Sequence, residues 1–359
     1  MFHKALWLRT YKQGKYFLIL FWLSSLYILP YAYYSAAQSQ LRLSKMKWDD
    51  YAYYYSYSFS APDIVIVQGL ILIAIACVLI GWERNNQSAD YLFSMPFKRK
   101  DIFLTKWLFG IVNIIMVNFV CWICMWGIKK VSFHNTYQDF NPFHTYFVYA
   151  TIVLIAIYTF SLFIGTITGN IFSQGSLTAV ILFLPYGLTL LVSGFLFTHI
   201  GGSSEEKYQI ERKTSDYLEQ ISIVSPLDRF SIHFDYHPEY HFDQQGNKIS
   251  SPNVNSVEYT RIPSTWKLLS PFIYIVLFLP IAITLYMKSP NEHNGNFLLF
   301  PQLQKWFIGC TVLCFSLLGG RALGANILWS YYLTFLGTGI ISYIILTRLL
   351  KWKFSFGGR

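Results

Sequence analysis

Six ionisable side chains alternate with other residues in one short stretch, a spacing that could bind a metal ion. The stretch runs from His233 to Asp243 and includes His237 and His241. On a β-strand, alternate side chains share a face and stand about 7 Å apart. Histidine and carboxylate ligands on one face suit zinc. The same pattern also describes the wet face of a half-buried strand whose aromatic residues point inward, so both interpretations stay open.

The composition is that of a membrane protein. Of the 359 residues, 54% are hydrophobic and 13% are charged, whereas a soluble domain carries about 25% charged residues. The formal net charge is +10, but the basic residues lie at the ends of apolar runs and form no stripe that would bind nucleic acid. All five cysteines lie inside apolar runs, which argues against a disulfide or a zinc site built from them. We therefore expect membrane lipid, and no nucleic acid, around the chain.

Catalytic and nucleotide-binding patterns are missing from the sequence. The only Gly-Lys pair, Gly14-Lys15, lacks the earlier glycine of a phosphate-binding loop. The apolar runs hold no Asp, Glu, Lys, Arg or His between their ends, which disfavours a proton- or ion-driven carrier. No haem, flavin or Ser-His-carboxylate pattern is found either. We expect the chain not to be an enzyme and to hold no cofactor of its own.

Eight apolar runs are long enough, or nearly so, to cross a bilayer. They predict an all-α polytopic membrane protein with a small α+β extracytoplasmic domain. The seventh run is short for a span, and glycines at its end, Gly319 and Gly320, leave a re-entrant hairpin as the alternative. The expected runs are 16–36, 64–82, 107–128, 145–169, 177–199, 268–287, 306–320 and 326–347.

The distribution of Lys and Arg predicts the orientation of the chain. With the N-terminus inside, the cytoplasmic segments hold 15 of these residues and the short outer loops hold 6. The positive-inside rule therefore places both termini in the cytoplasm. Residues 1–15 are expected to form a short interfacial helix. Three parts follow: 1–199 with five spans, 200–267 outside the membrane, and 268–359 with three more spans.

The segment 200–267 is expected to form one compact domain. An exposed helix should begin at Ser204 or the serine before it. Arg229–His241 and Lys248–Arg261, separated by a turn sequence, predict a β-hairpin. In the first outer loop, the tyrosine-rich stretch Trp48–Phe59 is expected to lie at the lipid headgroups as an aromatic belt, the alternative being contact with a substrate.

The densest polar and basic stretch between two apolar runs is Glu83–Lys106. Its apolar residues Ala89, Leu92, Phe93 and Pro96 fall at i, i+3, i+4 and i+7, which predicts one short helix lying along the membrane. Pro96 should end this helix, since the residue before a proline avoids the α region. An ordinary positively charged cytoplasmic loop is the alternative.

Two charged residues of this stretch carry structural expectations. Glu83 lies at the C-terminal end of the second run, where a carboxylate is unfavourable. It therefore requires a basic neighbour, such as Arg84 or Lys106. Asp101 is the expected N-cap of the third run.

The same stretch resembles the loop after the second span in ABC-2 type transporter permeases. The resemblance rests on Glu83, on Ser94-Met-Pro-Phe-Lys-Arg-Lys-Asp-Ile102 and on Lys106. These residues follow that family's acidic residue, its (L/M)-P-x-(S/K)-R-x-x-(I/L) turn and the lysine that opens its third span. The large outer segment before the last spans is similar to the plan of the Ytr-type permeases of Gram-positive bacteria, although eight runs exceed the usual six.

The resemblance implies that the stretch is a coupling helix seated in a cleft of a separate ATP-hydrolysing subunit. The chain would then lie in a bacterial plasma membrane and couple ATP hydrolysis to export or to conformational work at the cell surface. Its implied partners are a cytoplasmic ATPase dimer, which holds ATP and Mg, a second permease of the same or a related chain, and an extracytoplasmic partner. The alternative is a non-transporting membrane scaffold or accessory subunit of an envelope enzyme complex. The implied coupling residues are Glu83, Asp90, Leu92, Phe93, Pro96 and Arg99.

Overall fold

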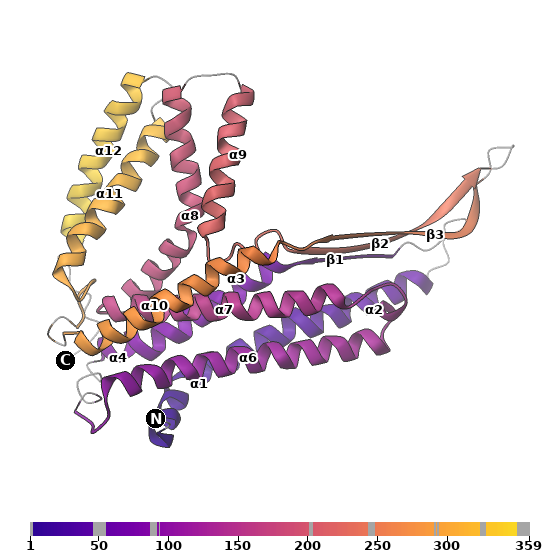
Figure 1. Cartoon of the computed structure of the whole chain (residues 1–359), viewed down its shortest axis with the longest axis horizontal. Helices are drawn as coiled ribbons and strands as arrows, with labels where there is room; N and C mark the ends of the chain where they lie inside the picture. Colours follow the sequence, from indigo (N-terminus) through magenta and orange to yellow (C-terminus); the bar gives the residue numbers. More distant parts are fainter. Residues whose placement is uncertain are drawn as a thin grey trace.

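Long apolar helices make up most of the protein (Figure 1). Within the described part of the chain, eight helical stretches are long and apolar enough to cross a membrane. Together with a small sheet of three strands, they confirm the predicted all-α polytopic membrane fold. The computed structural model describes residues 3–45, 55–86, 92, 94–200, 204–242, 248–290, 292, 294–323 and 328–349.

The first span is part of one long helix. α1 (Lys4–Leu26), a π-helical turn at Tyr27–Tyr31 and α2 (Ala32–Lys45) follow one another without interruption. Pro30 lies in the π-helical turn, where one wider turn accommodates the ring and the missing N–H. From Lys4 onward, residues 1–15 are helical and continue directly into the first span. Their expected position at the membrane interface stays a prediction.

The second span consists of α3 (Ala61–Ala76), a π-helical turn at Cys77–Gly81 and α4 (Trp82–Asn85). α6 (Arg99–Val131) forms the third and begins ahead of the expected position 107. Its N-cap is Lys98, so the prediction that Asp101 is the N-cap is wrong. Asp101 lies in the first turn instead, where its carboxylate still favours the positive end of the helix dipole.

α7 (Asn141–Ile167) is the central helix of the first bundle, which we define as α1, α3, α6, α7 and α10 (Leu269–Lys288). It packs against α3, α6 and α10, and most of its side chains are buried. The packing against α6 is close, because a Cβ added at Gly110 would overlap the ring of Tyr158. This bundle therefore holds the main apolar core.

α8 (Ile171–Ile200), α11 (Pro301–Leu323) and α12 (Leu328–Leu349) form a second bundle. They pack on one another and extend away from the first bundle (Figure 1). α11 is a single helix of 23 residues and is long enough to cross a bilayer, which favours a full span over the re-entrant alternative for the seventh run.

A three-stranded antiparallel sheet lies on the side of the first bundle opposite to α4. β2 (Ser231–Phe242) and β3 (Lys248–Arg261) form the predicted hairpin, and β1 (Tyr55–Ser60) pairs with β2. The third strand was not expected. Tyr55 and Phe59 are buried, which makes the aromatic-belt prediction wrong for these two residues. Residues 48–54 of that stretch lie outside the described residues.

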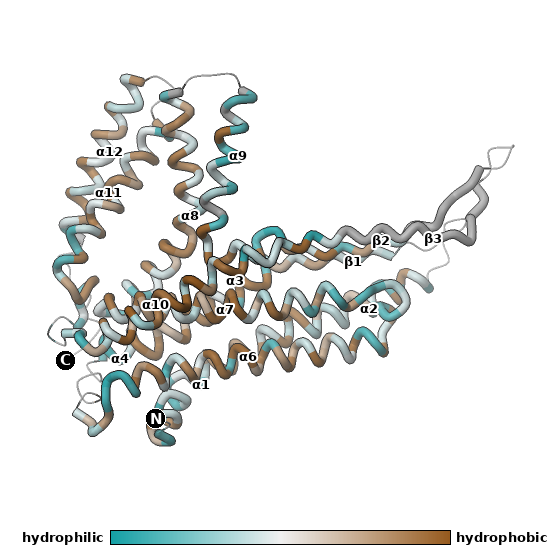
Figure 2. The backbone as a smooth tube through the Cα atoms, in the orientation of Figure 1, coloured by the Kyte–Doolittle hydropathy of each residue, from teal (hydrophilic) through white to brown (hydrophobic). Residues whose placement is uncertain are grey.

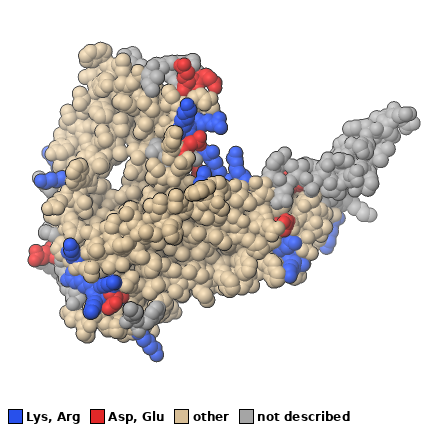
Figure 3. All heavy atoms as spheres, viewed as in Figure 1, with Lys and Arg blue, Asp and Glu red and all other residues tan. Residues whose placement is uncertain are grey.

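α9 (Ser204–Ile221) is the exposed helix predicted after the fifth span, and it packs beside α8. The division of the chain at 199 and 268 stays a prediction. Figure 2 shows hydrophobic residues along the middle of the long helices and hydrophilic residues on α9 and near helix ends. Figure 3 shows Lys, Arg, Asp and Glu around α9 and at the two ends of the first bundle, with a wide uncharged band between them. This distribution suits a chain that crosses a membrane.

Candidate functional site

A buried ion pair joins α4 to α6 at the end of the first bundle that we name the loop end. The Lys106 ammonium donates to the Glu83 carboxylate, and the two side chains are 3% and 5% exposed. Lys106 Nζ also donates to the carbonyl oxygen of Leu79 at 2.6 Å. Leu79 lies in the π-helical turn Cys77–Gly81, where the regular i→i−4 ladder is interrupted and a carbonyl becomes available. Lys106 is thus the basic neighbour that the position of Glu83 requires.

α1 contributes a second cation to the same carboxylate. Arg9 Nη2 lies 3.9 Å from Glu83 Oε1, and the Arg9 side chain is 30% exposed. The other terminal nitrogen, Nη1, lies 3.9 Å from the sulfur of Met95. Glu83 therefore has one close buried cation and one more distant cation that water reaches.

Arg84 follows Glu83 in sequence but engages a different helix. Its side chain is buried, and Nη1 donates to the carbonyl oxygens of Gly165, at 2.7 Å, and Thr168. These carbonyls lie in and just after the last turn of α7, whose final carbonyls lack helical partners and carry partial negative charge. Arg84 therefore caps the C-terminus of α7.

Arg99 makes the equivalent contact from the other side of the loop. Its Nη1 donates to the carbonyl oxygens of Met287 and Ser289, each at 3.2 Å, where α10 ends. One turn further along α6, the ring of Phe103 lies 5.4 Å from the ring of Tyr286. The start of α6 is thus tied to the C-terminus of α10.

The segment that follows α10 packs against the corner between α7 and α8. The amide of Gly295 donates to the carbonyl of Gly169 at 2.9 Å, and the amide of Leu299 donates to that of Ile167 at 2.9 Å. The ends of α4, α7 and α10 and the starts of α6, α8 and α11 therefore meet at the loop end.

The six predicted coupling residues lie in different surroundings, and the structure describes only four of them. Glu83 and Arg99 lie in this charged cluster, Leu92 is 1% exposed within the apolar core, and Pro96 lies in a bend before α6. Asp90 and Phe93 lie outside the described residues, as does most of the expected short helix. The role of all six toward an ATPase stays a prediction.

Sequence reasoning missed several members of the cluster. The hydroxyl of Tyr158 donates to the carbonyl of Lys106 at 2.8 Å, and Tyr286 lies under its ammonium at 5.9 Å from ring centroid to nitrogen. Arg9 lies in the stretch expected to be an interfacial helix, and no ion pair was predicted for it. These contacts join residues far apart in the sequence, and nothing in the local spacing of a single chain indicates them.

A second polar cluster lies at the opposite end of the first bundle, which we name the hairpin end. His134 Nε2 contacts the carbonyl oxygen of Tyr33 at 3.0 Å, and Nδ1 contacts the hydroxyl of Tyr55 at 2.5 Å. Gln138 Nε2 donates to the Tyr55 hydroxyl at 2.5 Å, and the Tyr33 hydroxyl donates to Gln138 Oε1 at 2.7 Å. These four buried residues, the polar ring, join α2, β1 and the turn before α7.

The hydrogen-bond directions in the polar ring are fixed by one acceptor. A carbonyl only accepts, so His134 Nε2 carries the proton and Nδ1 accepts from Tyr55. The neutral imidazole therefore fits every bond. Burial lowers the pKa of His134 from 6.5 to about 4, and the hydrogen bond to the Tyr33 carbonyl opposes this shift. Burial likewise raises the pKa of the nearby Tyr57 hydroxyl above its usual range.

The histidine stretch on β2 is described only at its start. His233 Nε2 lies 2.5 Å from Asp235 Oδ2, so the first two ionisable groups of one face are paired. The side chains of His237 and His241 lie outside the described residues. Among the described residues, no group of three or more His, Cys, Asp or Glu is arranged to hold a metal ion. A metal site that includes His237 and His241 stays a hypothesis.

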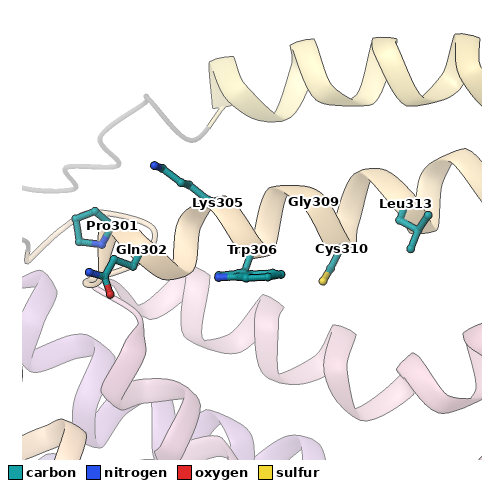
Figure 4. A pocket seen from close by; sticks show the side chains of 7 residues that line it. All are labelled: Pro301, Gln302, Lys305, Trp306, Gly309, Cys310 and Leu313. Atoms are coloured by element: carbon teal, nitrogen blue, oxygen red, sulfur yellow. The ribbon is translucent and has the colours of Figure 1, made fainter.

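A cavity of about 850 Å³ lies along α11 (Figure 4). Trp306 and Cys310 point to one side of the helix and Lys305 to another. The lining contains no carboxylate and no histidine, so this cavity offers no acid–base pair. Its residues are Pro301, Gln302, Lys305, Trp306, Gly309, Cys310 and Leu313.

The fold and its charged cluster define a multi-pass membrane protein whose second and third spans are linked through buried charges. Residues 51–217 match a family described as ABC-2 family transporter protein. The chain is 27% identical over 318 residues to a probable ABC transporter permease, YtrC, of Bacillus subtilis, covering 87% of this chain and 82% of that protein. It is 24% identical over 286 residues to the probable permease YtrD of the same organism, covering 78% of this chain and 77% of YtrD. These matches confirm the predicted resemblance to ABC-2 type transporter permeases and to the Ytr proteins. No solved structure matches the chain.

Proposed function

We propose that this chain is the membrane subunit of an ABC transporter in which a separate cytoplasmic ATPase drives export or conformational work at the cell surface. The observation that carries the proposal is the anchoring of the segment 86–98 from both sides. Glu83 and Arg84 precede this segment, Arg99 and Lys106 follow it, and all four contact other helices of the bundle. A partner that moves it would therefore move helix ends rather than a free surface segment.

The proposal assigns ATP and Mg to the partner and no catalytic residue to this chain. A second permease, the same chain or a related one, would complete the membrane part. The loop end would face the cytoplasm of a bacterial cell, together with both termini, and the sheet and α9 would lie outside. The excess of Lys and Arg in the segments assigned to the cytoplasm supports this orientation.

Purification of the complex tests the function directly. The chain should co-purify in mild detergent with an ABC ATPase, and ATPase activity should depend on that subunit. Phe93→Ala should weaken the association by about 1–3 kcal/mol, as expected for a truncated aromatic anchor at an interface centre. Phe119→Ala, at an exposed position in the middle of α6, is the matched control and should leave the association unchanged. Absence of any ATPase from the wild-type preparation would contradict the proposed function.

The orientation has its own test. Single cysteines at Asn86 and at Glu205, both exposed, are introduced into a variant that lacks the five native cysteines. In sealed cells, a membrane-impermeant thiol reagent should label the Glu205 position and reach the Asn86 position only after the cells are opened. Labelling of both from the same side would overturn the orientation.

A further inference from the structure

Two arginines flank the segment 86–98, and each caps the C-terminus of a different helix. Arg84 donates to the last carbonyls of α7, and Arg99 donates to the last carbonyls of α10. One arginine comes from the second span and the other from the third. The two arginines that flank the segment 86–98 therefore connect it to two different helices.

The chemistry of these contacts favours arginine. The final carbonyls of a helix lack partners in the helix and form the negative end of its dipole. A guanidinium stays charged and has several N–H donors in a fixed plane, so one Arg84 nitrogen reaches both Gly165 and Thr168. A glutamine in its place has one amide group and no charge. The contact is thus both directional and specific to a cation.

The two capped helices lead directly into the second bundle. α7 is followed after a short corner by α8, and α10 is followed by the segment 289–300 and α11. Backbone hydrogen bonds from Gly295 to Gly169 and from Leu299 to Ile167 join the segment after α10 to the corner between α7 and α8. α8, α11 and α12 pack on one another, so α7 and α10 both lead into one packed group of helices.

The buried pair Glu83–Lys106 does something different. It joins α4 to α6, and both helices belong to, or continue, spans of the first bundle. It therefore joins the two ends of the segment 86–98 within the first bundle.

We propose that Arg84 and Arg99 are positioning residues that transmit movement of the segment 86–98 to the bundle of α8, α11 and α12. The inference rests on the proposed function, since the ATPase is the source of the movement. The inference adds the C-terminal ends of α7 and α10 as the places where this movement is passed to the second bundle.

The test measures one distance between the bundles in the purified complex. Spin labels replace Val131, which is 91% exposed at the end of α6, and Trp329, which is 81% exposed on α12, in the cysteine-free chain. Pulsed electron resonance gives their separation without nucleotide and with ATP trapped by vanadate. The variants are Arg84→Gln, Arg99→Gln and both together. Arg229→Gln is the matched control, because Arg229 pairs with Asp216 at 3.6 Å on the surface, far from the loop in sequence.

ATPase binding is measured for each variant, because Arg99 is itself one of the predicted coupling residues. In complexes that retain the ATPase, we expect the variants to lose the ATP-dependent change in separation, most completely in the double variant. Arg99→Lys should restore part of the change, because a cation is returned to the end of α10. If burial of the Arg84 site prevents that variant from folding, Arg99→Gln, at a partly exposed site, carries the test alone.

The failures of the two proposals are distinguishable. A wild-type chain that binds no ATPase contradicts the proposed function. A wild-type complex that shows no change in separation, or a double variant that retains the full change with the ATPase bound, overturns the inference and leaves the proposed function intact.

Discussion

The two ends of the first bundle are held by different polar chemistry. At the loop end, the buried groups are full charges: Glu83, Lys106 and Arg84. At the hairpin end, the polar ring built around His134 and Gln138 is neutral throughout. The charged groups use helix carbonyls as additional partners, whereas the ring returns to its own starting residue, Tyr33.

This difference predicts different sensitivities. A buried charge that loses its partner stays in a medium that solvates it poorly, so the loop end should depend strongly on each member of its ion pair. Loss of one hydrogen bond in the neutral polar ring should cost much less stability. A proton added to His134 Nδ1, however, turns this atom from an acceptor into a donor, which does not fit the hydrogen bond from Tyr55. The loop end should therefore respond to substitution and the hairpin end to pH.

The largest effect is expected from Lys106→Met. Removal of the ammonium leaves the Glu83 carboxylate buried without its closest cation, while Arg9 lies 3.9 Å away. We expect the free energy of unfolding, measured by denaturant titration in detergent micelles, to fall by about 3–5 kcal/mol. The double variant Glu83→Gln with Lys106→Met is the control and should be more stable than Lys106→Met alone, because it removes the unpaired charge. A double variant less stable than the single variant would contradict the buried pair.

The loop end shows how far the sequence alone leads. Hydropathy is a local property, so the eight spans were predictable, and the position of Glu83 at a helix end was sufficient to predict a basic partner. The charged residues Lys98 to Lys100 were expected to precede the helix of the third span. Lysine and arginine are nevertheless good helix formers, and α6 begins among these residues. The caps made by Arg84 and Arg99 depend on where α7 and α10 end in space, which no spacing within the chain indicates.

The hairpin end was less predictable for a related reason. Alternating residues and a turn sequence identified β2 and β3, because a hairpin is a local structure. The tyrosines of β1 have the composition of both an aromatic belt and a strand, and only pairing with β2 from a distant part of the chain decides between them. The polar ring likewise requires three elements to meet.

An intermediate effect is expected from acid acting on His134. The unfolded chain binds a proton at this residue below about pH 6.5, whereas the folded chain, with the pKa lowered to about 4, does not until lower pH. The contribution of His134 to stability is therefore fully present above pH 6.5 and is lost progressively as the pH falls towards 4, by about 3 kcal/mol in total. The groups that face the ring are the tyrosines 33, 55 and 57, which do not titrate in this range.

The measurement is the melting temperature of the purified protein between pH 4 and pH 7.5, compared with that of His134→Gln. Other acid effects, from carboxylates elsewhere, are common to both proteins. The wild type should lose more stability than the variant across this range. Equal slopes for the two proteins would show that His134 is protonated freely in the folded state.

The smallest effect is expected from Arg9→Gln, which compares the two cations that face the Glu83 carboxylate. Lys106 and Arg9 both face Glu83, but the Arg9 side chain is 30% exposed and its contact is 3.9 Å long. Water screens such a pair, so its loss should change the free energy of unfolding by no more than about 1 kcal/mol. The same denaturant titration as for Lys106→Met checks this, repeated at low and high salt, because only a screened pair weakens as salt is added. A loss as large as that of Lys106→Met would mean that burial does not separate the two cations and that the loop end is held by net charge alone.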